Sequence, residues 1–204
     1  MLVFDRRSAT LGDASGRRFD PAQRVWTAGT VQGVAIELHA AVRWLQRDTT
    51  HRVRAPIGVI GPRSATDEQL AIAEEIGVGL ADMGLAVVCG GRQGIMEAVC
   101  RGVARHDGIA IGLLPETNAD AANPFVTISL ATGIGEARNA LVARAALCLV
   151  AIGDSYGTLS EVALGLQFGK RVFGLAGAAR VDGVNHVDTA AAALDSVAAV
   201  VLGV

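Results

Sequence analysis

The sequence predicts an α/β protein with a doubly wound, mostly parallel β-sheet and helices on both faces of that sheet. Two observations carry this prediction. The 204 residues are 51% hydrophobic but only 4% aromatic, and the mean hydropathy is +0.40. A chain rich in Ala, Val, Leu and Ile suits a buried parallel sheet covered by Ala-rich helices. From residue 57 onward, short apolar runs also alternate with longer segments of helical spacing, as in a doubly wound sheet.

The predicted strands are short apolar runs, beginning with IGVIG, and Pro115 ends the third of them. The predicted helices lie between the strands, and the first has Thr66 and Gln69 at the spacing of a capping box. Strands are expected at 57–61, 85–90, 109–114, 125–130, 147–153 and 171–176. Helices are expected at 66–84, 94–108, 136–146, 157–169 and 188–200.

Residues 55–204 are therefore expected to form a Rossmann-like nucleotide-binding domain. Residues 1–54 are expected to form an N-terminal hairpin-and-helix appendage, with a turn at 13–16 and a helix at 31–47. This appendage would supply extra packing or a dimer contact. Because ligands of doubly wound sheets bind beyond the carboxyl ends of the strands, the loops after the strands should share one binding edge.

Composition excludes several classes of function. The net charge of −2 shows no basic excess, so we expect no nucleic-acid partner. The four histidines are scattered and the three cysteines lack ligand spacing, so we expect no metal site. An odd number of cysteines in apolar surroundings is typical of reduced thiols in a cytoplasmic protein. No long apolar run predicts a signal peptide or a membrane span.

The stretch CGGRQGIMEA (89–98) follows a predicted strand and opens a helix. Gly90, Gly91 and Gly94 would let backbone N–H groups approach an anion at the helix N-terminus, and Arg92 could add charged hydrogen bonds. The spacing matches neither a Walker A loop nor G-x-G-x-x-G. The alternative is a tight turn whose glycines serve packing.

The stretch GDSYGTLSE (153–161) has the same layout. Ser155 or Thr158 could cap the helix or donate to a ligand oxygen. Glu161 could face a sugar at the edge of the sheet, or it could be a carboxylate favoured by the helix dipole. Arg138 follows two glycines at the start of a helix, where it could hold a phosphate or pair with a carboxylate.

The fourth stretch, GPRSATDE (61–68), is the first loop between a strand and a helix. Gly61, Arg63 and Ser64 are natural nucleotide contacts in a doubly wound sheet. Helix capping is the alternative explanation for the polar residues of this loop.

With these residues assembled, the chain resembles the Lonely Guy (LOG) superfamily of Rossmann-like proteins, and most closely the molybdenum cofactor carrier protein-like branch. The resemblance covers roughly 57–176 and rests on Gly-Gly-x-x-Gly-x-Met-Glu and Ala-Arg-Asn. It is carried by the segments IGVIGPR, VVCGGRQGIMEAVCRGV, IGLLPETNADAANPFVTISLATGIGEARN and VAIGDSYGTLSEVALGLQFGKRV.

The resemblance implies a homodimer or homotetramer whose phosphate-binding loops are 90–94 and 153–158. LOG phosphoribohydrolases cleave the N-glycosidic bond of nucleoside 5′-monophosphates, and their catalytic Arg and Glu correspond to Arg138 and Glu161. Asn139 stands where those hydrolases have Lys. Gly153-Asp154-Ser155 replaces Pro-Gly-Gly, which should reduce or redirect the anion affinity of that loop. Asp154 could point to solvent or pair with Arg92 or Arg138, and a phosphorylated ligand should be held mainly by the 90–94 loop.

The leading hypothesis is a binding or carrier protein for a phosphorylated, nucleotide-like or pterin-phosphate ligand, with the molybdenum cofactor or a nucleotide as cargo and no cofactor required for activity. The alternative is a nucleoside 5′-monophosphate phosphoribohydrolase, and a third is an oligomeric scaffold that has lost its ligand. The ligand-binding residues predicted are Gly61, Arg63, Ser64, Gly90, Gly91, Arg92, Gln93, Gly94, Met96, Pro115, Arg138, Asn139, Gly153, Ser155, Tyr156, Gly157, Thr158 and Glu161.

Overall fold

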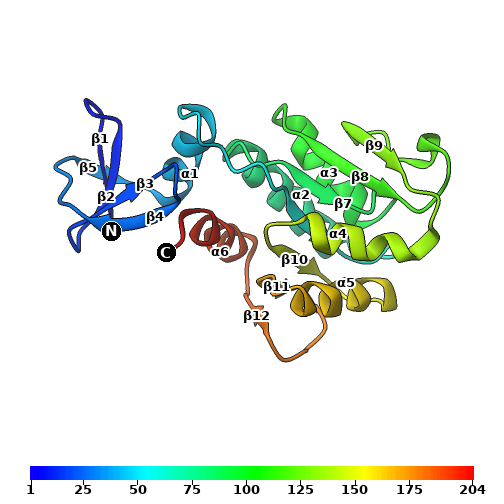
Figure 1. The fold of residues 1–204 in the computed structure, drawn as a ribbon. Helices are drawn as coiled ribbons and strands as arrows, with labels where there is room; N and C mark the ends of the chain where they lie inside the picture. Colours follow the sequence, from blue (N-terminus) through cyan, green and yellow to red (C-terminus); the bar gives the residue numbers. More distant parts are fainter. The chain divides into compact units, whose positions relative to one another are not determined.

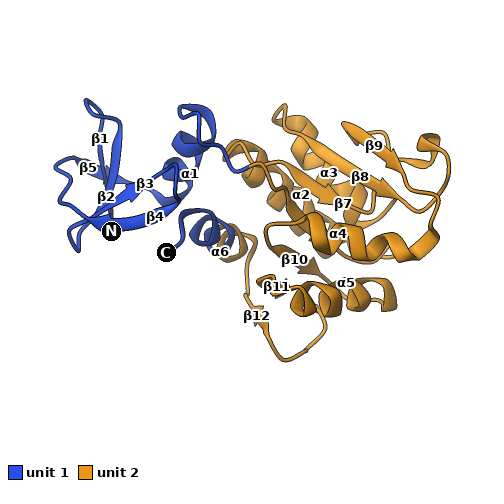
Figure 2. Ribbon diagram, viewed as in Figure 1, with its two compact units in different colours: residues 1–53, 195–204 blue, residues 54–194 orange.

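The computed structural model describes residues 1–204, which divide into two compact units (Figures 1 and 2). The larger unit contains residues 54–194, and the smaller contains residues 1–53 together with 195–204. The last helix, α6 (Ala190–Leu202), begins in the larger unit and ends in the smaller one. No helix has both the length and the apolar character needed to cross a membrane.

The larger unit is built on a seven-stranded sheet with the order β12-β11-β10-β6-β7-β8-β9. Every pair of neighbouring strands is parallel, which confirms the predicted fold class. The central strands are buried along their whole length, as expected for strands covered on both faces. The strands are β6 (Ile57–Ile60), β7 (Val87–Cys89), β8 (Ala110–Leu114), β9 (Ile128–Ala131), β10 (Leu149–Ile152), β11 (Val172–Leu175) and β12 (Val184–His186).

Helices cover both faces of this sheet. α2 (Asp67–Asp82) packs against α3 (Ile95–Arg105) on one face, and α4 (Asn139–Ala145) packs against α5 (Tyr156–Gln167) on the other (Figure 1). Two short 3-10 helices, η1 (Ala119–Ala121) and η2 (Gly135–Arg138), lie in the connections. The predicted capping box of α2 is present, because the Thr66 side chain accepts from the Gln69 backbone and the Gln69 side chain from the Thr66 backbone.

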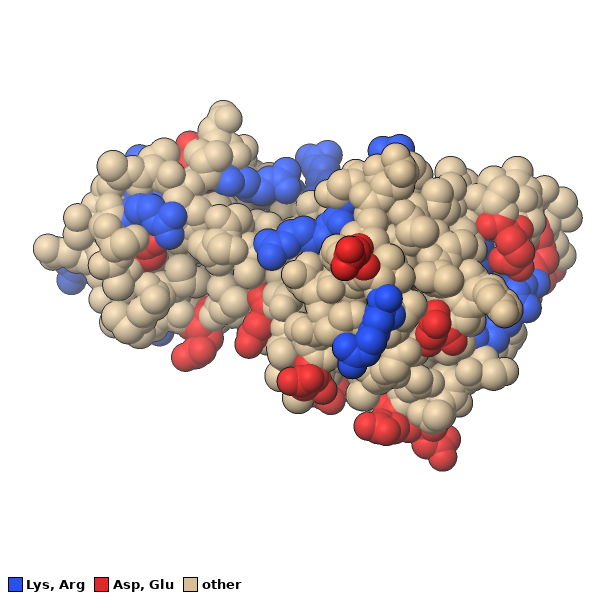
Figure 3. Space-filling model, turned by 90° about the horizontal axis from the view of Figure 1, so that it is seen from below, with Lys and Arg blue, Asp and Glu red and all other residues tan.

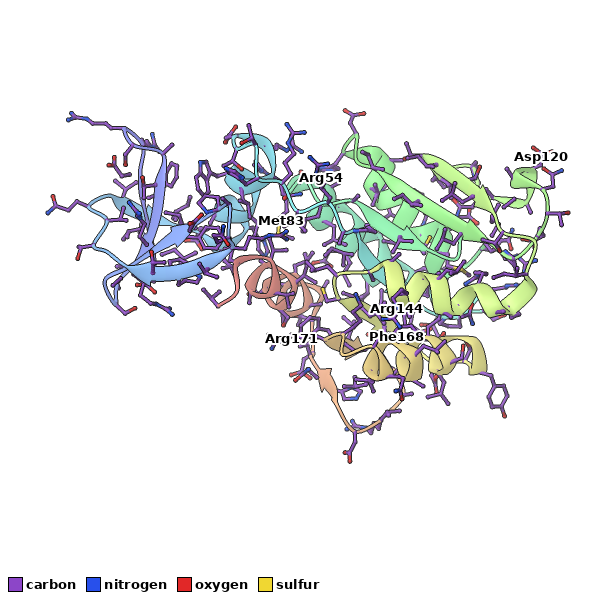
Figure 4. All side chains as sticks on the ribbon, viewed as in Figure 1. Arg54, Met83, Asp120, Arg144, Phe168 and Arg171 are labelled. Atoms are coloured by element: carbon purple, nitrogen blue, oxygen red, sulfur yellow. The ribbon has the colours of Figure 1, made fainter.

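The interface between α4 and α5 includes a cation–π contact. The Arg144 guanidinium lies over the ring of Phe168, 3.5 Å from its centroid (Figure 4). Arg144 is exposed to solvent, and Phe168, at the end of α5, presents an aromatic face to its guanidinium group.

The order of the strands creates a switch point in the sheet. The chain places β7, β8 and β9 successively on one side of β6, and then returns to place β10 on the other side of β6. The loops that follow β6 and β10 therefore leave the carboxyl edge in opposite directions, and a crevice opens between them. The candidate site lies in this crevice.

The smaller unit contains a five-stranded antiparallel sheet, the helix α1 (Leu38–Arg47) and the end of α6. The predicted turn at 13–16 is present, because the Asp13 carboxylate accepts hydrogen bonds from the backbone N–H groups of Ser15 and Arg17. The order is β4-β3-β2-β1-β5, with β1 (Leu2–Asp5), β2 (Thr10–Asp13), β3 (Arg17–Asp20), β4 (Val25–Ala28) and β5 (Val34–Ile36).

The prediction of a helix from residue 31 is wrong. The helix begins at Leu38, because Val34–Ile36 pair with the free edge of β1 as strand β5. Aromatic packing ties the sheet to the two helices of this unit. The Phe4 ring meets the Trp44 ring of α1 at 5.2 Å, and the Trp26 indole N–H donates to the carbonyl of Leu202 in α6.

Candidate functional site

A cleft of about 890 Å³ lies at the switch point between β6 and β10. Three segments line most of it: the loop after β6, the turn that contains η2 and the start of α4, and the corner between β10 and α5. The lining residues are Gly61, Pro62, Arg63, Ser64, Met96, Glu136, Arg138, Asn139, Asp154, Ser155, Tyr156, Gly157, Thr158, Ser160 and Glu161.

The cleft brings together eleven of the eighteen predicted ligand-binding residues, and Gly94 lines an adjoining hollow of about 280 Å³. The other six lie outside both: Gly90, Gly91, Arg92, Gln93, Pro115 and Gly153. On the face seen in Figure 3, acidic and basic side chains are interspersed.

A buried ion pair forms the inner wall of the cleft. Arg138 and Glu161 have side chains only 5% and 8% exposed, and Arg138 Nη1 lies 3.3 Å from Glu161 Oε1. The same nitrogen donates to Asn139 Oδ1 at 2.7 Å, and Asn139 Nδ2 donates to Ser160 Oγ at 2.8 Å. Ser160 Oγ in turn donates to the carbonyl of Gly157, so the pair is tied to the first turn of α5.

The position of Glu161 raises its pKa from 4.5 to about 7. Desolvation by burial is the largest cause, the Arg138 cation opposes it, and the carboxylate of Glu136 raises the pKa further. Burial therefore outweighs the ion pair. A carboxyl group with this pKa exchanges a proton near neutral pH, which is the property that general acid–base chemistry requires. Glu161 lies in the second turn of α5 and faces the cleft.

Gly90 leaves room for Arg138. A Cβ at position 90 would lie 2.8 Å from the guanidinium carbon of Arg138 and 2.7 Å from Met96 Sδ. A side chain directly after β7 would therefore displace the ends of the Arg138 and Met96 side chains. Arg138 Nε is buried without a hydrogen-bond partner, so this side chain keeps one donor uncommitted.

The rest of the 90–94 loop is held by the protein itself. Asn123 Nδ2 donates to the carbonyls of Gly91 and Arg92 at 3.2 and 3.0 Å. The first N–H of α3, from Ile95, donates to the carbonyl of Pro62 at 3.2 Å. Gly94 has φ +71°, and a side chain there would collide with the backbone at Pro62. The packing alternative thus accounts for these glycines, and phosphate binding by the 90–94 loop stays a prediction.

Arg92 does not line the cleft itself but belongs to an ion-pair cluster with Glu136, which does. It pairs with Glu116, and its Nη1 lies 3.7 Å from Glu136 Oε1. Arg63 reaches the same oxygen of Glu136 at 3.4 Å. Sequence reasoning missed Glu116, Asn123 and Glu136. Glu136 offered a signal, because it stands two residues before Arg138 at the predicted start of a helix.

The corner between β10 and α5 keeps a helix N-terminus open to the cleft. Ser155 is the N-cap, and its Oγ accepts from the Thr158 N–H at 3.1 Å. Because the first N–H groups of any helix lack intrahelical partners, those of Tyr156 and Gly157 remain for water or a ligand. Asp154 is exposed at the rim, and Arg92 and Arg138 pair with other carboxylates.

The fold and the cleft define a Rossmann-like α/β protein with a binding crevice at the switch point of its sheet. The sequence model of the SLOG cluster4 family matches residues 54–201, and the chain belongs to this family. A relative in Archaeoglobus fulgidus, an uncharacterized protein, is 35% identical over 133 residues, which are 65% of this chain and 87% of the relative.

Solved structures of molybdenum cofactor proteins are similar to this chain. The molybdenum cofactor binding protein of Rippkaea orientalis is 31% identical, with a TM-score of 0.69 over 73% of this chain and 99% of that one. The molybdenum cofactor carrier protein of Chlamydomonas reinhardtii is 32% identical, with a TM-score of 0.66 over 72% and 98% of the two chains. DNA processing protein A of Streptococcus pneumoniae, at 19% identity over 70% and 60%, with a TM-score of 0.56, shares the fold alone.

Proposed function

We propose that this protein binds and carries a phosphorylated small molecule, nucleotide-like or pterin-like, in the cleft between β6 and β10. The observation that carries the proposal is the cleft itself, which lies where doubly wound sheets bind ligands and exposes the N-terminus of α5. The likeness to carriers of the molybdenum cofactor supports a carrier role. The cofactor, or a nucleotide, would be the cargo.

The N-terminus of α5 is the feature of the cleft that fits an anionic ligand, since the charged side chains lining the cleft are two arginines and three carboxylates. A phosphate there would meet the N–H groups of Tyr156 and Gly157 and the positive end of the helix dipole. Asp154 lies on the exposed rim, where solvent and salt screen its repulsion. Arg138 lies deeper, with an uncommitted Nε donor for the remainder of the ligand. The roles of the predicted residues in binding are part of this proposal.

A substitution at the helix cap tests the proposal. Asp is a good N-cap, so Ser155→Asp keeps the helix but adds a negative charge beside the bound phosphate. We expect AMP or a phosphorylated pterin to raise the melting temperature of the wild type, and Ser155→Asp to bind about tenfold more weakly. Thr66→Asp makes the same change at the N-cap of α2, outside the cleft, and should bind as the wild type does. Failure of every ligand to stabilise the wild type would count against a carrier.

The buried pair of Arg138 and Glu161 favours a second candidate function, a nucleoside 5′-monophosphate phosphoribohydrolase. In this reaction the N-glycosidic bond breaks, water adds its oxygen to the ribose carbon, and the base leaves with a proton. The Glu161 carboxylate would stabilise the positive ribosyl centre or accept the proton of the water. Arg138 would hold the substrate in position.

Release of free base distinguishes the two functions. Incubation of the wild type with AMP, followed by chromatography, should yield adenine and ribose phosphate if the protein is a hydrolase. Glu161→Gln should then abolish release, whereas Glu75→Gln, at an exposed carboxylate of α2, should not change it. Stabilisation by AMP without release of adenine supports the carrier.

We also propose that the protein is cytoplasmic and forms a homo-oligomer. Exposed apolar side chains on α4 and α5, such as Leu141 and Leu159, support a homodimer or homotetramer. No disulfide links the three cysteines, in keeping with a reducing compartment. Sedimentation velocity would measure the assembly, and Leu141→Glu should shift it toward the monomer.

A further inference from the structure

Two arginines from different loops meet on a single carboxylate oxygen. Arg63, in the loop after β6, places Nη2 3.4 Å from Glu136 Oε1. Arg92, in the loop after β7, places Nη1 3.7 Å from that same oxygen. Convergence of two guanidinium groups on one oxygen is the arrangement with which proteins bind phosphate oxygens. Glu136 therefore occupies a position that suits an oxyanion.

The members of this cluster are held unequally. Glu136 is 67% exposed and Arg63 48%, whereas Arg92 is only 21% exposed and also pairs with Glu116. Exposed ion pairs contribute little to stability, so the Glu136 carboxylate can leave at small cost. Glu116 keeps Arg92 in place when it does. Arg63 and Glu136 both line the cleft, so the vacated position would open toward the ligand.

We infer that Arg63 and Arg92 form an anion subsite, which the Glu136 carboxylate fills in the free protein and from which a phosphate group of the ligand displaces it. The inference rests on the proposed function, since the ligand enters through the same cleft. With Glu136 displaced, two arginines face one remaining carboxylate, Glu116, and the subsite carries a net positive charge. Glu136 thus acts as an internal competitor that weakens the binding of phosphate.

Calorimetric titration with inorganic pyrophosphate tests the subsite directly. Glu136→Gln removes the competitor and should tighten binding about threefold to tenfold, which is the range for loss of two exposed ion pairs. Arg63→Gln should weaken binding about tenfold. Glu75→Gln changes the net charge as Glu136→Gln does, but lies on the exposed face of α2 and should bind as the wild type does. These positions are exposed, so thermal melting should show that every variant folds.

The double variant of Arg63→Gln and Glu136→Gln shows whether Glu136 weakens pyrophosphate binding through Arg63. If Glu136 competes for Arg63, the gain from Glu136→Gln should shrink toward onefold when Arg63 is already Gln. An undiminished gain in the double variant, or no gain in Glu136→Gln over Glu75→Gln, would overturn the inference. So would the absence of pyrophosphate binding in all variants.

Parallel titrations with AMP separate this inference from the proposed function. Binding of AMP, together with pyrophosphate binding that is unchanged by substitution of Arg63 or Glu136, leaves the carrier proposal in place and removes the subsite. Coupled binding of pyrophosphate without binding of any nucleotide or phosphorylated pterin leaves the subsite in place and removes the proposed cargo.

Discussion

Gly90 and Arg138 share one space: the guanidinium of the buried arginine fills the volume that a side chain at position 90 would need. The two residues lie far apart in the sequence, and Arg138 lines the cleft whereas Gly90 does not. This contact explains why a glycine follows β7, and it links a predicted phosphate loop to the packing of a candidate catalytic residue.

Gly90→Ala should therefore destabilise the protein. The new methyl group forces Arg138 or Met96 to move, and such overpacking costs about 1–3 kcal/mol in the free energy of unfolding. Gly157→Ala is the matched control, because a Cβ there meets only Ser155 Oγ, at 3.7 Å, and lies within a helix. That substitution should be neutral or stabilising by about 0.5–1 kcal/mol. Urea unfolding measures both, and equal effects would contradict the shared space.

The sheet could be predicted from sequence because its strands are short apolar runs with glycine or proline at their ends. A continuous apolar run indicates a buried strand by itself. The strands β6, β7, β8, β10 and β11 could therefore be recognised without knowledge of their neighbours. The strands β5 and β12 could not, because most of their residues are exposed and no buried apolar run marks them in the sequence.

The candidate site could be predicted in part. Arg138, Asn139 and Glu161 lie in motifs that a resemblance to a family makes visible, and the cleft contains them. The roles of Gly90 and Asn123 could not be predicted, because both depend on contacts between segments far apart in the sequence. The ion pairs of Glu136 are invisible for the same reason.

The pKa of Glu161 predicts how stability changes with pH. The folded pKa is about 7 and the ordinary value is 4.5, so the folded chain holds this proton more tightly than the unfolded chain does. The free energy of unfolding therefore falls as pH rises from 4.5 to 7. Below pH 4.5 no stability is lost, and above pH 7 the whole loss is present. This loss in the free energy of unfolding is on the order of 3 kcal/mol.

Glu161→Gln removes this titration. Its free energy of unfolding, measured by urea between pH 4 and pH 8, should rise relative to that of the wild type as the pH increases. Glu75→Gln, at an exposed carboxylate, should follow the wild type throughout. If Glu161→Gln also runs parallel to the wild type, the carboxyl group does not titrate with a raised pKa.

The negative charge of Glu136 should affect the pKa of Glu161. Because the Glu136 carboxylate raises the pKa of Glu161, Glu136→Gln should lower that pKa toward its ordinary value. Carbon-13 NMR titration of the glutamate side chains would follow the change. Glu75→Gln is the control for net charge, and an unchanged midpoint for Glu161 in the Glu136 variant would show that the two carboxylates do not interact.

Ser155 should stabilise α5 through its cap. Ser155→Ala removes the acceptor for the Thr158 N–H and should lower the free energy of unfolding by about 1 kcal/mol. Ser155→Thr retains a hydroxyl group and should lose less than half of that amount. The same loss in both variants, measured by thermal unfolding, would point to packing of the side chain in place of the hydrogen bond.

The parallel pairing of the larger sheet also determines the order in which the protein can fold. No two of its strands can form a hairpin, because all neighbouring strands are parallel. The strands β6 and β10 can pair only after the long segment between them has folded back. Such non-local pairing is slow, whereas the antiparallel strands β1 and β2 can pair through a short turn. We therefore expect the cleft at the junction of β6 and β10 to be assembled late in folding, after the long segment between these strands has folded.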